Sequence, residues 1–201
     1  MGGAMFRKIS NPHRFLVLFV GLALILLYFV PLWCIRLVAP QYPEGLGMYI
    51  GIHSITGLSP HDLQNINLLN HYVGMEKIIE ASIPELQFMP YILGFMIFGA
   101  FVTFFYDRLA MVYLGILNFF LVGGAGLYDF WRWEYNYGHR LNPDAPISIP
   151  GMTYQPPFIG CKQLLNITSC SWPHEGGILL FLSVAVLLYV VIQEQRRAKK
   201  V

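Results

Sequence analysis

Charged residues are scarce in this chain and absent from four long stretches of it. Only 12% of its 201 residues are Asp, Glu, Lys or Arg. Each stretch is about long enough for a helix to cross the roughly 30 Å hydrocarbon core of a bilayer. The first stretch is free of charge from Phe15 to Trp33, and the four predict spans at about residues 15–36, 88–106, 109–128 and 176–193. We therefore expect one four-span membrane domain over residues 1–201.

The missing chemistry excludes several classes of protein. The spans contain no histidine or carboxylate at membrane depth, which disfavours cation-coupled transport and haem ligation by paired helical histidines. There is no Gly-x-Ser-x-Gly, His-Glu-x-x-His or phosphate-binding glycine loop, so nothing supports hydrolytic catalysis. The basic tails beside the spans are typical of an orientation signal, so we expect no nucleic-acid binding.

The positive charges predict the orientation of the chain in its membrane. Eight of the thirteen Lys and Arg residues lie in the two tails and the 107–108 turn, whereas the loops at 37–87 and 129–175 hold most of the acidic residues. By the positive-inside rule, both termini face the cytoplasm and both loops lie outside it. We expect an all-α fold, a multi-pass protein of the cytoplasmic (inner) membrane with an extracytoplasmic cap made of these two loops.

Cysteine is rare, with only three residues and no Cys-x-x-Cys pair. This absence leaves thioredoxin-like redox chemistry and covalent haem attachment without support. Cys161 and Cys170 both lie in the second loop, where an oxidising compartment would let them form a disulfide. The alternative is two unrelated buried thiols, and the sequence does not decide between them.

The first loop predicts an amphipathic helix at about 60–83, which we expect to pack against the second loop. On that helix His71 and Met75 are four residues apart and would lie side by side. Imidazole and thioether ligands suit copper(I), so the pair is a candidate half-site, although an ordinary helix face is the alternative. One pair cannot form a tight site. Further ligands would come from His139 first, then Met152 and His61, with Met48 and His53 as other candidates.

The second loop begins with an aromatic and polar run at 129–140. An interfacial aromatic belt accounts for its tryptophans but explains its acidic residues less well. Part of the run is therefore a candidate pocket wall. The candidate pocket residues are Asp129, Trp133, Glu134 and, from the first loop, Glu76.

Four strings in the two loops carry a family resemblance. They are Asn-Leu-Leu-Asn-His-Tyr-Val-Gly-Met at 67–75, the run at 129–139, Pro-Gly-Met-x-Tyr-Gln-Pro-Pro at 150–157, and Lys-Gln-Leu-Leu-Asn at 162–166. With these strings the chain, from about residue 36 onward, resembles a family of small polytopic membrane proteins encoded beside nitrous-oxide reductase and its copper-maturation genes. The resemblance implies association with a copper enzyme that is assembled outside the cytoplasmic membrane.

These observations leave three functional hypotheses. The first is a membrane-anchored accessory protein that handles copper, or that assists assembly or electron supply of an extracytoplasmic copper enzyme. The second is a quinol-interacting or small-substrate enzyme subunit, favoured by an apolar, carboxylate-lined pocket open to the bilayer. The third is a structural scaffold. The sequence leaves enzyme activity undecided and favours an accessory role, with copper as cofactor and the bilayer, the copper enzyme or its maturation factors as partners.

Overall fold

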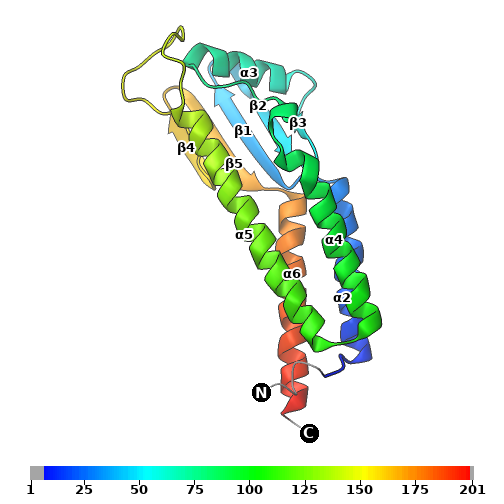
Figure 1. The fold of residues 1–201 in the computed structure, drawn as a ribbon. Coiled ribbons are helices and arrows are strands. Elements are labelled where there is room, and N and C mark those ends of the chain that lie inside the picture. Colours follow the sequence, from blue (N-terminus) through cyan, green and yellow to red (C-terminus); the bar gives the residue numbers. More distant parts are fainter. Residues whose placement is uncertain (1–6, 200–201) are drawn as a thin grey trace.

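The computed structural model describes residues 7–199 and divides into a helical bundle and a cap stacked on one end of it (Figure 1). Residues 1–6 and 200–201, part of the expected single domain, lie outside the described chain. The bundle helices are α2 (Asn11–Ile25), α4 (Glu85–Tyr106), α5 (Leu109–His139) and α6 (Glu175–Ala198), and a short 3-10 turn, η1 (Leu26–Tyr28), extends α2.

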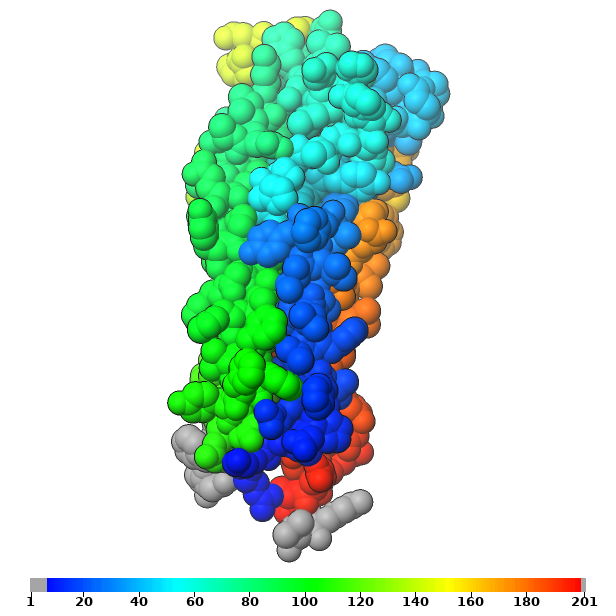
Figure 2. Space-filling view, turned by 90° about the vertical axis from the view of Figure 1, so that its right-hand side faces the viewer, coloured from blue at the N-terminus to red at the C-terminus, as the bar shows by residue number. Residues whose placement is uncertain are grey.

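Four helices of the described chain are long and apolar enough to cross a membrane, as expected. The bundle exposes large apolar side chains such as Phe19, Phe95 and Phe120, which suits contact with lipid. Its interior is a cluster that includes Val20, Leu24 and Val112. Figure 2 shows α2 and α4 running beside each other through the lower part of the molecule.

The expectation of an all-α fold is wrong, because the cap contains a five-stranded antiparallel sheet. Its order is β3-β2-β1-β5-β4. The strands are β1 (Trp33–Ala39), β2 (Tyr42–Ile50), β3 (Ile55–Gly57), β4 (Gly160–Leu164) and β5 (Ile167–Pro173). Central strand β1 pairs with β5 from Trp33 opposite Pro173 to Val38 opposite Thr168. The two loops are therefore one folded unit, joined by strand pairing.

The helix expected at about 60–83 is shorter than predicted. Helix α3 runs over Asp62–Val73 and ends where Gly74 adopts a left-handed conformation with φ 81°. The chain then folds back in an extended path to a 3-10 turn, η2 (Glu80–Ser82). The amide of Asn67 holds this path by accepting from the Ile78 N–H at 2.7 Å and donating to its carbonyl at 3.1 Å. The left-handed glycine therefore ends the helix ten residues early.

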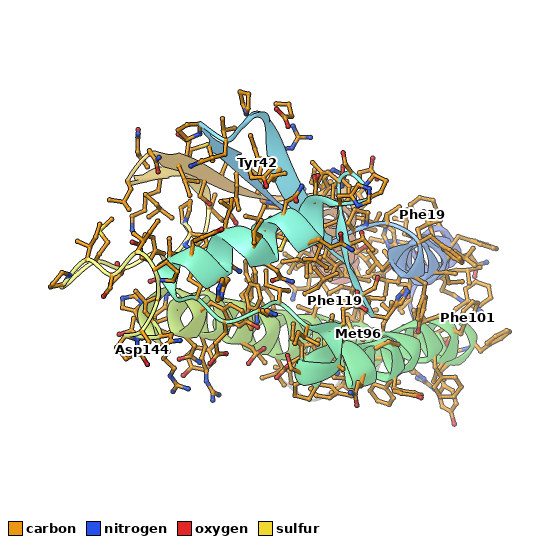
Figure 3. All side chains as sticks on the ribbon, turned by 90° about the horizontal axis from the view of Figure 1, so that it is seen from above. Phe19, Tyr42, Met96, Phe101, Phe119 and Asp144 are labelled. Atoms are coloured by element: carbon orange, nitrogen blue, oxygen red, sulfur yellow. A yellow bond between two sulfur atoms is a disulfide. The ribbon has the colours of Figure 1, made fainter. Side chains whose placement is uncertain are left out.

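The two loops pack together, as expected. The amide N–H of Asn142 donates to the Gly74 carbonyl at 2.8 Å, and that of Ile147 donates to Tyr72 at 2.9 Å. In the view from above, the sheet lies on one side of α3 and α5 lies on the other (Figure 3). The cap core between them is formed by Trp33, Ile35, Leu46, Met48, Ile55, Ile66, Ile78 and Tyr137.

Candidate site: a buried carboxylate in the cap

A small, partly open cavity of about 70 Å³ lies within the cap core. Its walls come from β1, β2, α3, the upper part of α5 and residues 154–167. Most of the lining side chains are apolar. Those that matter for its chemistry are Met48, Met75, Trp133, Glu134, Tyr137 and Tyr154.

The upper part of α5 places its side chains outside the membrane-spanning part of the helix. α5 has 31 residues, about 46 Å at the helical rise, whereas a bilayer core is about 30 Å thick. Asp129 is the first carboxylate along α5, and burial and the nearby carboxylate of Glu85, the first residue of α4, both raise its pKa. Glu134 lies more than one helical turn beyond Asp129, at the level of the sheet.

Glu134 is the most unusual residue of the cap. Its side chain is 0% exposed, and neither carboxylate oxygen makes a hydrogen bond to any residue of the described chain. Burial raises the pKa of this carboxyl from 4.5 to about 8, because an apolar environment disfavours the charged form. An unpaired buried acid is costly to a fold, so a group of this kind indicates a role in binding or proton transfer.

Helical spacing explains why Glu134 points inward. Phe130 lies four residues before Glu134, Trp133 lies one residue before it, and Tyr137 lies three residues after it. All three aromatic side chains pack in the cap core. The rings of Trp133 and Tyr137 lie 4.5 Å apart between centroids. Glu134 thus shares the sheet-facing side of α5 with a row of aromatic residues, and the aromatic packing excludes water from it.

Two further polar atoms at the cavity lack hydrogen bonds within the described residues. They are the hydroxyl of Tyr154 and the indole Nε1 of Trp133. Tyr154 is brought to the cavity by a backbone hydrogen bond from its N–H to the Gly138 carbonyl at 2.9 Å. A ligand in the cavity could therefore meet one acid, one hydroxyl and one indole N–H.

Two thioethers line the same cavity. Met48 comes from β2 and is buried, and Met75 follows the left-handed Gly74. Thioether sulfur is a soft, polarisable donor that prefers soft ions such as copper(I). The cavity thus combines two soft neutral donors with one ionisable oxygen donor.

The structure places the two residues of the predicted copper half-site in different surroundings. Because α3 ends at Val73, Met75 leaves the helix and lines the cavity, whereas His71 stays exposed. His61 is exposed at the other end of α3, and Met152 is half-buried in the loop after α5. His139 is exposed, and its Nδ1 lies 2.9 Å from the Tyr135 carbonyl oxygen. Within residues 7–199, no three His, Cys, Asp or Glu side chains are placed to share a metal ion.

The predicted pocket residues lie in three places. Trp133 and Glu134 line the cavity. Glu76 lies in an open groove of about 410 Å³ beside Arg140, and Asp129 is half-buried beside α4 instead. Met75 lines both the groove and the cavity, so the two spaces meet at this residue.

Tyr137 and Tyr154 line the cavity without having been predicted as site residues, and Met48 was only a further candidate ligand. Met48 belongs to β2, where the glycines and prolines of the sequence predict irregular loop, and Tyr154 lies in a proline-rich segment without periodicity. Neither residue carries a local signal. The inward position of Glu134 did have one, because Phe130, Trp133 and Tyr137 share its face at helical spacing.

Cys161 and Cys170 form a disulfide in the structure. They are directly opposite each other on β4 and β5. The bridge stiffens a hairpin whose last pair, Leu164 opposite Ile167, lines the cavity. Cys34 is a buried free thiol on β1.

Comparison with known protein families and with curated proteins finds no match for this chain. The family resemblance of the loop strings therefore stays a prediction, and the functional argument has to come from the site.

Proposed function

We propose that this chain is a membrane-anchored accessory protein that holds copper(I) in its cap and serves an extracytoplasmic copper enzyme. One observation carries the proposal: a fully buried carboxyl with no hydrogen-bond partner in the described part of the chain shares a cavity with two methionine thioethers. The bound site we propose consists of Met48, Met75 and Glu134. It replaces the half-site of His71 and Met75, of which only Met75 is retained.

The charge balance supports a monovalent cation as the ligand. A carboxylate alone is unfavourable in this apolar cavity, which is why burial raises its pKa. A copper(I) ion entering the cavity would displace the proton of Glu134 and neutralise the carboxylate, while the two thioethers complete a soft environment. The proton and the ion exchange one for one, so the net charge of the cavity stays zero.

Cavity size disfavours the quinol alternative. A cavity of about 150 Å³ accommodates benzene, and this cavity has about half that volume. The lining residues also belong to the cap, with none from α2, α4 or α6. The apolar wall and protonated acid do suit a small-substrate acid site, which remains the second candidate function, and the scaffold reading is a third possibility.

A route for the ion is suggested by the shared position of Met75. The open groove carries the carboxylate of Glu76, and Met75 borders both that groove and the cavity. A methionine side chain has three rotatable bonds and changes shape at low cost. We propose that ions collect in the groove and pass Met75 into the cavity.

The proposed location follows the charge distribution. The cap lies at the end of the bundle opposite residues 7 and 199 (Figure 1). With the cation-rich end in the cytoplasm, the positive-inside rule places the cap outside the cytoplasmic membrane. Together with the family resemblance, this arrangement supports a copper enzyme assembled outside the cytoplasm, or its maturation factors, as the partner.

A copper(I) competition titration on detergent-purified protein tests the proposal. Met48→Leu, Met75→Leu and Glu134→Gln keep side-chain volume close to that of the wild type, and each should weaken binding at least tenfold. His71→Ala and Met152→Leu are the matched controls and should bind like the wild type. If His71→Ala alone lost copper binding, the result would support the half-site of His71 and Met75 instead. Absence of copper binding in the wild type would refute copper handling.

A further inference from the structure

The end of the molecule opposite the cap is rich in cations. Seven lie there among the described residues: Arg7, Lys8, Arg14, Arg108, Arg196, Arg197 and Lys199. Only Asp107 and Glu194 offset them, and Lys200 lies outside the described part. The cations come from three separate segments, namely the residues before and at the start of α2, the turn between α4 and α5, and the end of α6.

Backbone pairing fixes two of these segments to each other. The Ile9 N–H donates to the Asp107 carbonyl at 2.7 Å, and the Leu109 N–H donates to the Arg7 carbonyl at 3.0 Å. Lys8 and Arg108 form an antiparallel bridge between them. The cations of the N-terminal segment are therefore displayed on an ordered element next to the α4–α5 turn.

The carboxylate of Glu194 fixes the third segment. It accepts hydrogen bonds from the Ser10 hydroxyl at 2.6 Å and from the Ser10 N–H at 2.9 Å, and His13 also contacts it. The carboxylate of Asp107 forms two ion pairs. The Lys8 ammonium lies 3.4 Å from it and the Arg14 guanidinium lies 3.7 Å from it. Both acids are thus occupied in joining the segments, and the surface keeps an excess of positive charge.

We propose that this end is a preorganised binding surface for the headgroups of anionic phospholipids. The cations flank the ends of four membrane-crossing helices, where lipid phosphates lie within reach of exposed side chains. Arg7, Arg196 and Lys199 are exposed and form no ion pair with Asp107 or Glu194 in the described part of the chain, so their charge is directed to the surroundings. The fixed backbone lowers the ordering cost of binding.

Native mass spectrometry in mixed lipid–detergent micelles tests this proposal. The probes are phosphatidylglycerol and phosphatidylcholine with identical acyl chains. The test variant combines Arg7→Gln, Arg196→Gln and Lys199→Gln, which leaves the contacts of Asp107 and Glu194 in place. The control variant removes three exposed cap cations through Arg36→Gln, Arg140→Gln and Lys162→Gln.

The wild type should retain phosphatidylglycerol at least fivefold more than phosphatidylcholine. The test variant should lose at least two thirds of that preference, and the cap control should keep it. Equal retention of the two lipids by the wild type, or an equal loss in both variants, would overturn the proposal. Displacement of the lipid by glycerol phosphate alone would show a soluble-phosphate site and would also overturn it.

Discussion

The bundle and the cap are stabilised in different ways. On the bundle half of α5, a Cβ added to Gly115, Gly123 or Gly124 would meet no described atom within 4 Å beyond its chain neighbours and the backbone of its own helix. Farther along the same helix, an added Cβ on Gly138 would meet the backbone N of Gln155 at 2.3 Å. One helix therefore passes from a lipid-facing environment with spare room to a tightly packed one. The comparison indicates that steric specificity in α5 is concentrated in the cap.

The largest expected effect comes from matched glycine substitutions on α5. Gly138→Ala should destabilise the cap by about 4 kcal/mol, since the new methyl group meets backbone that cannot move without breaking the hydrogen bond from Tyr154 to Gly138. Gly124→Ala should be neutral or slightly stabilising. Urea unfolding monitored by tryptophan fluorescence measures the stability of the cap, because all four tryptophans lie in it.

The control for this experiment is hydrogen exchange of the bundle. Peptides from α4 and α6 should exchange alike in the wild type and in Gly138→Ala, while peptides from β1 and β5 should exchange faster in the variant. If Gly124→Ala destabilised the protein as much as Gly138→Ala, the proposed difference between the two halves of α5 would be wrong.

Hydropathy was sufficient to predict the bundle, because a span is recognised by its own composition. It failed for the sheet, because β1 and β5 are about 140 residues apart and each is short. Trp33 to Arg36 follows an apolar run without a break and was counted as the end of the first span, although these residues belong to β1. Pairing of distant strands leaves no signal in either segment alone.

The site was predicted only in part for the same reason. Trp133 and Glu134 belong to one periodic helix face, so their common position could be read from spacing. The pairing of His71 with Met75 assumed that the helix continues, and the left-handed Gly74 ends it between them. Met48 reaches the cavity through strand pairing, which the sequence alone did not reveal.

The second prediction concerns the pH dependence of the cap without copper. The pKa of Glu134 is about 8 in the folded cap and near 4.5 when unfolded, so the folded state binds more protons between these values. Stability should therefore fall as pH rises, by about 3 kcal/mol between about pH 5.5 and about pH 8. Urea unfolding at several pH values, read by tryptophan fluorescence, measures the slope.

Glu134→Gln provides the control for this slope. The amide has nearly the same shape and does not titrate in this range, so the variant should lose most of the pH dependence. If stability fell with pH equally steeply in Glu134→Gln, other groups would cause the pH dependence. The buried acid would then not distinguish the cap from the bundle.

The smallest effect is expected from the disulfide between β4 and β5. Cys161→Ser with Cys170→Ser should lower cap stability by about 2.5 kcal/mol, because the short loop they close no longer restricts the unfolded chain. Gln163→Ser with Thr168→Ser alters a neighbouring cross-strand pair of the same hairpin and should cost less than 1 kcal/mol, roughly the range for such pairs. Tryptophan-detected urea unfolding compares the two double variants directly. Since the bridge lies wholly within the sheet, exchange in α2 and α4 should not change, and faster exchange there would show that the bundle depends on the cap for its stability.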